Sequence, residues 1–135
     1  MTFGKYLLSY VLTLIVFLII DLTWLGVIAK GIYQRQLGHL MSEQINWLAA
    51  IAFYFLFVGG VFFFVILPAV EKGSLLRALW MGAFFGLVTY ATYDLTNLAT
   101  LRGFPASIVW IDLLWGCVLT ATVSCAGYWV IMKVK

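Results

Sequence analysis

Four long apolar stretches constrain this sequence more than any other feature. They cover residues 6–29, 47–67, 75–101 and 106–132. Each exceeds the roughly 20 residues that a helix needs to cross the hydrocarbon of a bilayer, and none shows the short alternating segments of a membrane β-barrel. The sequence therefore predicts an all-α, polytopic membrane protein with four transmembrane helices in one bundle. We expect residues 1–135 to form a single four-helix transmembrane domain.

The composition excludes a soluble protein. Hydrophobic residues make up 65% of the chain and charged residues only 10%, whereas about a quarter of the residues in soluble domains are charged. Cys117 and Cys125 lie in one apolar stretch, about 12 Å apart along a helix, which is too far for a disulfide. No metal-binding, phosphate-binding or RNA-binding motif is present. We expect the lipid bilayer as a partner, with no metal, no cofactor and no nucleic acid.

Basic residues stand singly near the ends of the apolar stretches, where they indicate orientation. Cytoplasmic segments of membrane proteins carry an excess of Lys and Arg. The side with both termini and the second connection carries Lys5, Lys72, Arg77, Lys133 and Lys135, and the opposite side carries Lys30, Arg35 and Arg102. This difference of five to three predicts that both termini lie in the cytoplasm.

The connection over residues 30–46 allows two interpretations. Its apolar residues recur at intervals that fit one face of a helix lying at the membrane interface. Gly31 and Gly38 interrupt that pattern and equally favour a plain surface loop. Both interpretations stay open at this point.

Small residues and helix breakers divide and pack the other segments. Pro68 is expected to close the second helix, Ser74 to cap the third, and Gly103 to turn the chain into the fourth. Gly82 and Gly86 form a small-residue motif on the third helix. Such a motif predicts close contact between helices, either inside one chain or between two copies.

Three acids inside the apolar stretches are the strongest functional feature. Asp21 lies nine residues before Lys30, Asp94 lies eight residues before Arg102, and Asp112 lies ten residues after Arg102. At 1.5 Å per helical residue, all three are about 12–15 Å from the same membrane boundary. Acids within a membrane are energetically costly, face the protein interior and mark functional sites by default. The spacing predicts that the three carboxyl groups converge on one layer.

Aromatic and polar side chains lie near each acid on the same helix or at the same depth on the second helix. The candidate site for a ligand or a proton comprises Asp21, Asp94, Asp112, Asn97, Tyr90, Tyr54, Trp24 and Trp115. Three carboxyl groups in a medium of low dielectric constant cannot all stay ionised, so they share a proton or surround a cation. The alternative is that these acids only join the helices through hydrogen bonds.

Three phrases of the sequence carry a family resemblance. They are the segments Ile20–Gly26, Tyr33–His39 and Ala91–Thr100, the last of which contains the specific run Tyr-Asp-Leu-Thr-Asn-Leu. The chain resembles a bacterial membrane-protein family of unknown function, DUF2177, over nearly its whole length. The resemblance implies a four-helix protein of the bacterial inner membrane. It implies no activity, cofactor or catalytic residue.

The acids leave three functions to compare. The first is a multi-pass membrane protein that binds or moves protons, a cation or a small ligand, cationic ligands included, with a homodimer as its natural working unit. The second is an intramembrane enzyme or binding protein for a lipid or another apolar substrate, in which one acid donates and another accepts a proton. The third is an accessory or structural membrane subunit. No activated nucleophile identifies a catalytic residue.

Overall fold

The computed structural model describes residues 1–135, which form helices and no strand. The helices are α1 (Phe3–Thr23), α2 (Lys30–Leu37), α3 (Trp47–Val61), α4 (Leu67–Glu71), α5 (Leu75–Thr100) and α6 (Ala106–Val134). A π-helical turn, Trp24–Ile28, extends α1, and a second one, Phe62–Ile66, joins α3 to α4. Four continuous helices are therefore long and apolar enough to cross a membrane: Phe3–Ile28, Trp47–Glu71, Leu75–Thr100 and Ala106–Val134. The predicted all-α fold with four membrane-spanning helices is confirmed.

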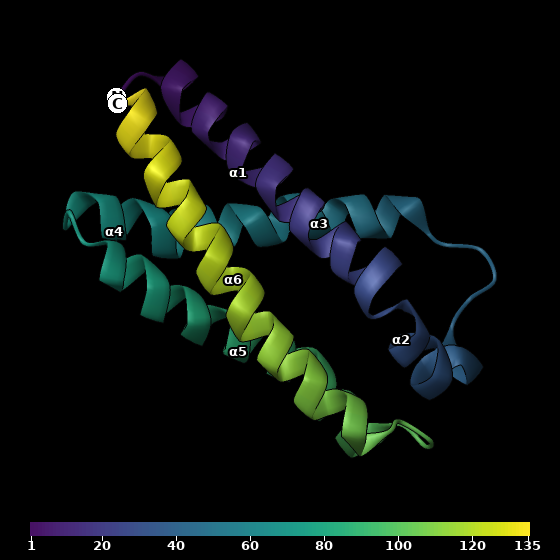
Figure 1. Cartoon of the computed structure of the whole chain (residues 1–135). Helices are drawn as coiled ribbons and strands as arrows, with labels where there is room; N and C mark the ends of the chain where they lie inside the picture. The colour runs from purple at the N-terminus through teal and green to yellow at the C-terminus, as the bar shows by residue number, and fades with distance from the viewer.

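The helices differ in how they contact one another. The antiparallel pair α5 and α6 shares the most extensive interface, and α1 packs along the other side of α6. The rod made of α3 and α4 crosses these helices, while the two chain ends lie together at one end of the molecule (Figure 1). The first half of this rod contacts α1, whereas its π-helical turn contacts α5 and α6. The start of α3 therefore diverges from the α5–α6 pair.

Glycines allow α5 and α6 to approach closely. A Cβ atom on Gly86 would collide with the carbonyl oxygen of Gly116, and one on Gly82 would lie 2.9 Å from the carbonyl oxygen of Thr120. A Cβ on Gly116 would in turn lie 2.5 Å from the ring of Tyr90. The small-residue motif thus makes its contact inside one chain, and it holds the helices that carry Asp94 and Asp112 against each other.

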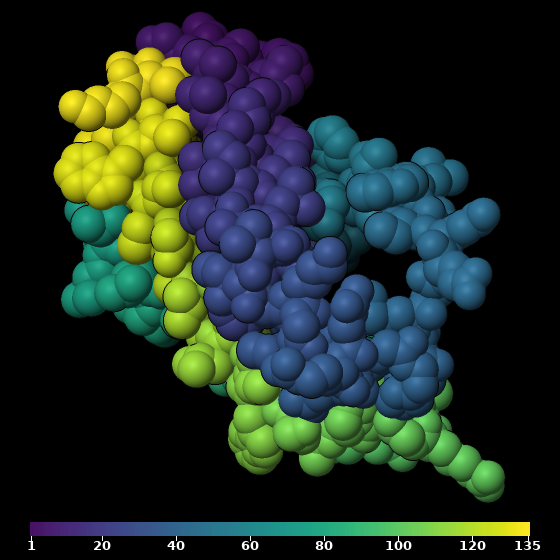
Figure 2. Space-filling view, turned by 45° about the vertical axis from the view of Figure 1, so that its right-hand side comes forward, coloured from purple at the N-terminus to yellow at the C-terminus, as the bar shows by residue number.

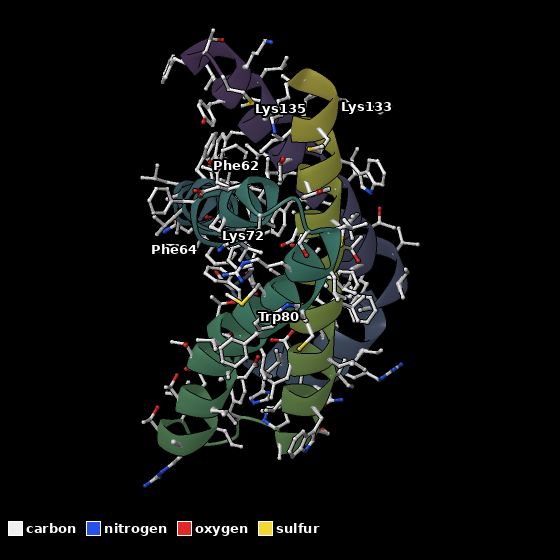
Figure 3. The ribbon with its side chains drawn as sticks, turned by 90° about the vertical axis from the view of Figure 1, so that its left-hand side faces the viewer. Phe62, Phe64, Lys72, Trp80, Lys133 and Lys135 are labelled. Carbon is white, nitrogen blue, oxygen red and sulfur yellow. The ribbon has the colours of Figure 1, made fainter.

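Apolar side chains cover the outside of the helices as well as the core. Phe17, Val58, Ile66 and Leu119 are fully buried between α1, the α3–α4 rod and α6. The Phe64 side chain on the outer face is nevertheless 62% exposed. Every long helix has other large apolar side chains that are exposed. Phe64 lies on the outer side of the rod, and Lys133 and Lys135 lie at the end that holds the termini (Figure 3). Such a surface suits lipid tails rather than water.

The expectation that Pro68 closes the second helix is wrong. The helix continues through Pro68 to Glu71. The reason is the preceding π-helical turn, in which the backbone N–H of Leu67 donates to the carbonyl of Phe62, five residues earlier. Pro68 then occupies the first turn of a new α-helical segment, where a missing N–H does little harm. The chain turns only after Lys72, at Gly73, whose φ is +62°.

The first connection contains both structures that the sequence left open. Residues 30–37 form the helix α2, a short 3₁₀ turn follows, and residues 41–46 form an irregular segment. Gly31 does not break the helix, and α2 packs beside the turn between α5 and α6. There, Nε2 of His39 lies 2.9 Å from the carbonyl oxygen of Gly103, and Ser107 donates a hydrogen bond to Gln36. The connection therefore packs against the end of the molecule that holds the turn between α5 and α6.

Candidate intramembrane binding site

A cavity of about 590 Å³ fills the wedge where α3 diverges from α5 and α6. Side chains of α1, α2, α3, α5 and α6 and the segment after α2 line it. Figure 2 shows a hollow on this face between the end of α2 and the start of α3, with the connecting segment along its outer edge. Eleven of the 14 lining residues are hydrophobic, so this wedge, which we call the cleft, favours an organic occupant over a hydrated ion.

Two of the three acids lie at the wall of the cleft. Asp21 on α1 and Asp112 on α6 line it, and their side chains are 6% and 9% exposed. Asp94 on α5 is 1% exposed; it does not line the cleft but lies near Asp112, on the helix that packs against α6. The three helices α1, α5 and α6 therefore each bring one carboxyl group to the same part of the cleft, two of them in its wall and one near Asp112.

Asp94 and Asp112 form a close pair. The carboxyl group of Asp94 lies close to that of Asp112. The Oδ2 atom of Asp94 is buried and has no hydrogen-bond partner in the protein. Two adjoining carboxyl groups in a low dielectric are stable when a proton lies between them or a positive charge lies beside them. No lysine, arginine or histidine lines the cleft to supply that charge.

A hydrogen-bonded aromatic group fixes the acids of the cleft in place. The hydroxyl of Tyr33 donates to Oδ1 of Asp112 over 2.5 Å, and Nε1 of Trp24 donates to the Tyr33 hydroxyl over 3.2 Å. Nε1 of Trp115 donates to Oδ1 of Asp21 over 3.3 Å. The Trp24 and Trp115 rings are stacked, with centroids 4.3 Å apart and an interplanar angle of 10°. The group joins α1, α2 and α6 around the acids.

Tyr33 keeps its proton under ordinary conditions. Burial, together with the hydrogen bond to Asp112, raises the pKa of the Tyr33 hydroxyl above its usual value. The phenol therefore acts as a hydrogen-bond donor toward the carboxylate at neutral pH.

The structure brings most of the candidate residues together. Asp21, Asp112, Tyr54, Tyr90 and Trp115 line the cleft. Among the others, Asp94 and Trp24 lie directly behind this lining through their contacts with Asp112, Tyr33 and Trp115.

Asn97 does not line the cleft. The cleft meets α5 at Thr89, Tyr90 and Tyr93, so it extends from Asp94 toward the middle of that helix. Asn97 lies about 4.5 Å beyond Asp94 in the opposite direction along the helix axis. Asn97 and Tyr90 lie on the same face of α5, but only Tyr90 lines the cleft.

Tyr33 is the site residue that the sequence did not predict. It lies outside the four apolar stretches, where aromatic residues commonly sit at the membrane interface. The sequence pattern that could have indicated its position is the apolar face of the connection, which includes Ile32, Tyr33 and Leu37. In the structure these three side chains pack against a buried cluster at the start of α6. A helical face that packs against α6 beside Asp112 carries its tyrosine to that acid.

The geometry does not resemble a metal centre. No three histidine, cysteine, aspartate or glutamate side chains come together in an arrangement that could hold a metal ion. The arrangement can instead accept hydrogen bonds from, or neutralise, a positively charged or hydrogen-bonding group that enters the cleft.

The model of a family described as "Predicted membrane protein (DUF2177)" matches residues 6–129. No curated protein and no solved structure matches the chain. Since the match covers nearly all of the sequence, including all three acids, the chain belongs to the DUF2177 family of predicted membrane proteins.

Proposed function

We propose that this protein binds a small amphipathic molecule inside the membrane, with the apolar body in the cleft and the polar end at Asp21 and Asp112. The observation that carries the proposal is an apolar cavity of about 590 Å³ with carboxyl groups at one end. That volume falls within the range of ligand pockets, which combine apolar walls with a few polar groups. One chain builds the whole cleft, so the proposal does not require a second copy.

Entry from the bilayer fits the position of the cleft. Phe53 on α3 and Tyr93 on α5 line it, and their side chains are still 48% and 56% exposed. These two side chains therefore belong both to the cleft and to the outer surface of the helices. A molecule dissolved among lipid tails can pass between them without crossing a polar layer.

The packing role of the acids does not account for the cleft. The α5–α6 contact is closed by glycines, and the main apolar core lies between α1, the α3–α4 rod and α6. Acids that served only to join helices would be needed at closed interfaces. Asp21 and Asp112 instead border an open space, which favours contact with a further molecule.

A second candidate is an intramembrane enzyme that acts on a lipid. The Asp94–Asp112 pair favours it, because one protonated and one ionised carboxyl group can act as general acid and general base. The same pair supports exchange of a proton with a bound molecule. Both candidates require that the cleft first binds an apolar molecule, so the same experiment tests their common basis.

The experiment uses a neutral alkyl alcohol that carries a photoreactive diazirine. We expect the probe to label cleft residues of α3 and α5, such as Tyr54 and Tyr93, more strongly than the exposed Leu114 on α6. Ala50→Trp fills the cleft and should reduce this labelling at least severalfold. The matched variant Ala52→Trp, at an exposed position of the same helix, should leave it unchanged. Uniform labelling of all lipid-facing positions would contradict the proposal.

We also propose that the protein lies in a bacterial inner membrane with both termini in the cytoplasm. The excess of basic residues on the side of the termini supports this orientation. A fluorescent protein fused after Lys135 should fold and fluoresce, while alkaline phosphatase at the same position should be inactive. An active phosphatase fusion with a dark fluorescent fusion would reverse the orientation.

A further inference from the structure

We propose that the polar end of the bound molecule is an organic ammonium group, either an amine or a quaternary ammonium, on an apolar body. This inference rests on the proposed binding function and specifies its ligand class. Its starting point is the cleft, in which acids and aromatic rings meet without any basic side chain.

The first argument is charge. If Asp94 and Asp112 share one proton, the three acids still carry two negative charges. No basic residue lines the cleft, and the hydrogen-bond donors to Asp21 and Asp112 are the neutral side chains of Trp115 and Tyr33. An anionic headgroup would be repelled, whereas a cation would offset the cost of the buried carboxylates.

The second argument is the unsatisfied acid. Asp94 is 1% exposed, and its buried Oδ2 atom has no hydrogen-bond partner in the protein. Asp112 and Asp21 each accept one hydrogen bond at Oδ1, from Tyr33 and Trp115 respectively, and the second oxygen of Asp21 accepts none from the protein. A positive group against Asp112 would stabilise the whole pair.

The third argument is the aromatic wall. Seven of the 14 lining residues are aromatic, among them Phe53, Tyr54, Tyr90, Tyr93 and Trp115. Aromatic faces attract cations, and a desolvated cation–π contact contributes about 2 kcal/mol; quaternary ammonium groups are bound by such aromatic cages. A hydrated metal ion gains little from such walls, but an alkylammonium group can contact rings and carboxylates at once.

The ammonium group can come from two sources. It can belong to a lipid headgroup, such as ethanolamine, or to a free lipophilic amine. The two share the chemistry that the cleft recognises, but a phospholipid also brings a phosphate toward Asp21 and Asp112. The experiment therefore includes both as competitors.

The test compares two diazirine probes of equal alkyl length on the full chain in neutral maltoside micelles. One probe ends in a trimethylammonium group and the other in a hydroxyl group. We expect the ammonium probe to label the cleft at a concentration about tenfold lower than the alcohol. A free alkylamine should compete with it, and competition by phosphatidylethanolamine would identify a lipid headgroup as a source.

The acids are tested with isosteric variants. Asp21→Asn combined with Asp112→Asn should remove the preference for the ammonium probe, so that the two probes label the cleft at similar concentrations. Glu71→Gln, which removes an exposed acid far along the chain from the cleft, should change neither. Equal labelling of the cleft by both probes in the unmodified protein would overturn the ammonium inference and leave the binding function standing. If neither probe reaches the cleft, both proposals fail.

Discussion

Replacing Gly86 by alanine should separate α5 from α6 and lower the free energy of unfolding by about 3 kcal/mol. The new methyl group would collide with the carbonyl oxygen of Gly116 and lie 2.6 Å from Oγ1 of Thr120. The main obstacle is backbone, which cannot rotate away as a flexible side chain does. Since α5 and α6 carry Asp94 and Asp112, the carboxyl pair should separate together with the helices.

The measurement is unfolding of the purified protein in maltoside micelles, followed by the loss of helical circular dichroism with heat or dodecyl sulfate. Gly26→Ala is the matched control, because a Cβ atom there would meet nothing within 4 Å. That control should be neutral or slightly stabilising, since alanine favours a helix more than glycine does. Equal stability of the Gly86 and Gly26 variants would show that the two helices do not pack as described.

Replacing Asp112 by leucine should also cost about 3 kcal/mol, whereas asparagine at this position should cost less than about 1 kcal/mol. Leucine removes the acceptor for the Tyr33 hydroxyl and leaves the buried carboxyl group of Asp94 without the polar group of residue 112 beside it. The amide of asparagine can accept from Tyr33 and donate to Asp94 at the same time. The difference between the two variants therefore isolates hydrogen bonding from charge.

The same unfolding assay measures these variants. Tyr33→Phe removes two hydrogen bonds of the group, the one to Asp112 and the one from Trp24, but it keeps Asp112 beside Asp94. Its loss of stability should therefore fall between those of Asp112→Asn and Asp112→Leu. If the leucine variant were as stable as the asparagine variant, the hydrogen bonds around Asp112 would not contribute to the fold. Suppose that Asp112→Asn keeps its stability but no longer prefers the ammonium probe. The carboxyl group of Asp112 would then act in binding rather than in packing.

The sequence predicted the helices well because length and hydropathy determine them directly. Each apolar stretch exceeds the membrane thickness, and the residue counts from Lys30 and Arg102 placed Asp21, Asp94 and Asp112 at one level. Those counts require only the constant rise of an α-helix. They work for any straight helix that spans the bilayer.

The sequence could not predict how the helices are tilted and rotated. In a membrane, both the core-facing and the lipid-facing sides of a helix are apolar, as the buried Val58 and the 78% exposed Leu56 of α3 show. Hydrophobic periodicity then carries little information about which side faces inward. For this reason the divergence of α3, which creates the cleft, was not evident from the sequence.

Local backbone chemistry explains the remaining differences. A proline in a regular α-helix removes a hydrogen bond, so Pro68 predicts a helix end. The π-helical turn Phe62–Ile66 changes the hydrogen-bonding pattern just before it, and the helix continues. Tyr33 entered the site because the connection docks on the start of α6. Neither the turn nor the docking leaves a strong local sequence pattern.

The hydrogen bond between Trp115 and Asp21 has a consequence for biosynthesis. The two residues are 94 positions apart in the chain, so the acid enters the bilayer long before its donor is made. At roughly 5–20 residues per second, that interval is about 5–20 s. During this time the first helix carries an unpaired acid among lipids or translocation machinery, which favours its sliding toward the aqueous boundary. Insertion of α6 supplies the partner and fixes the depth of α1, so this contact between the two helices forms only after Trp115 has entered the bilayer.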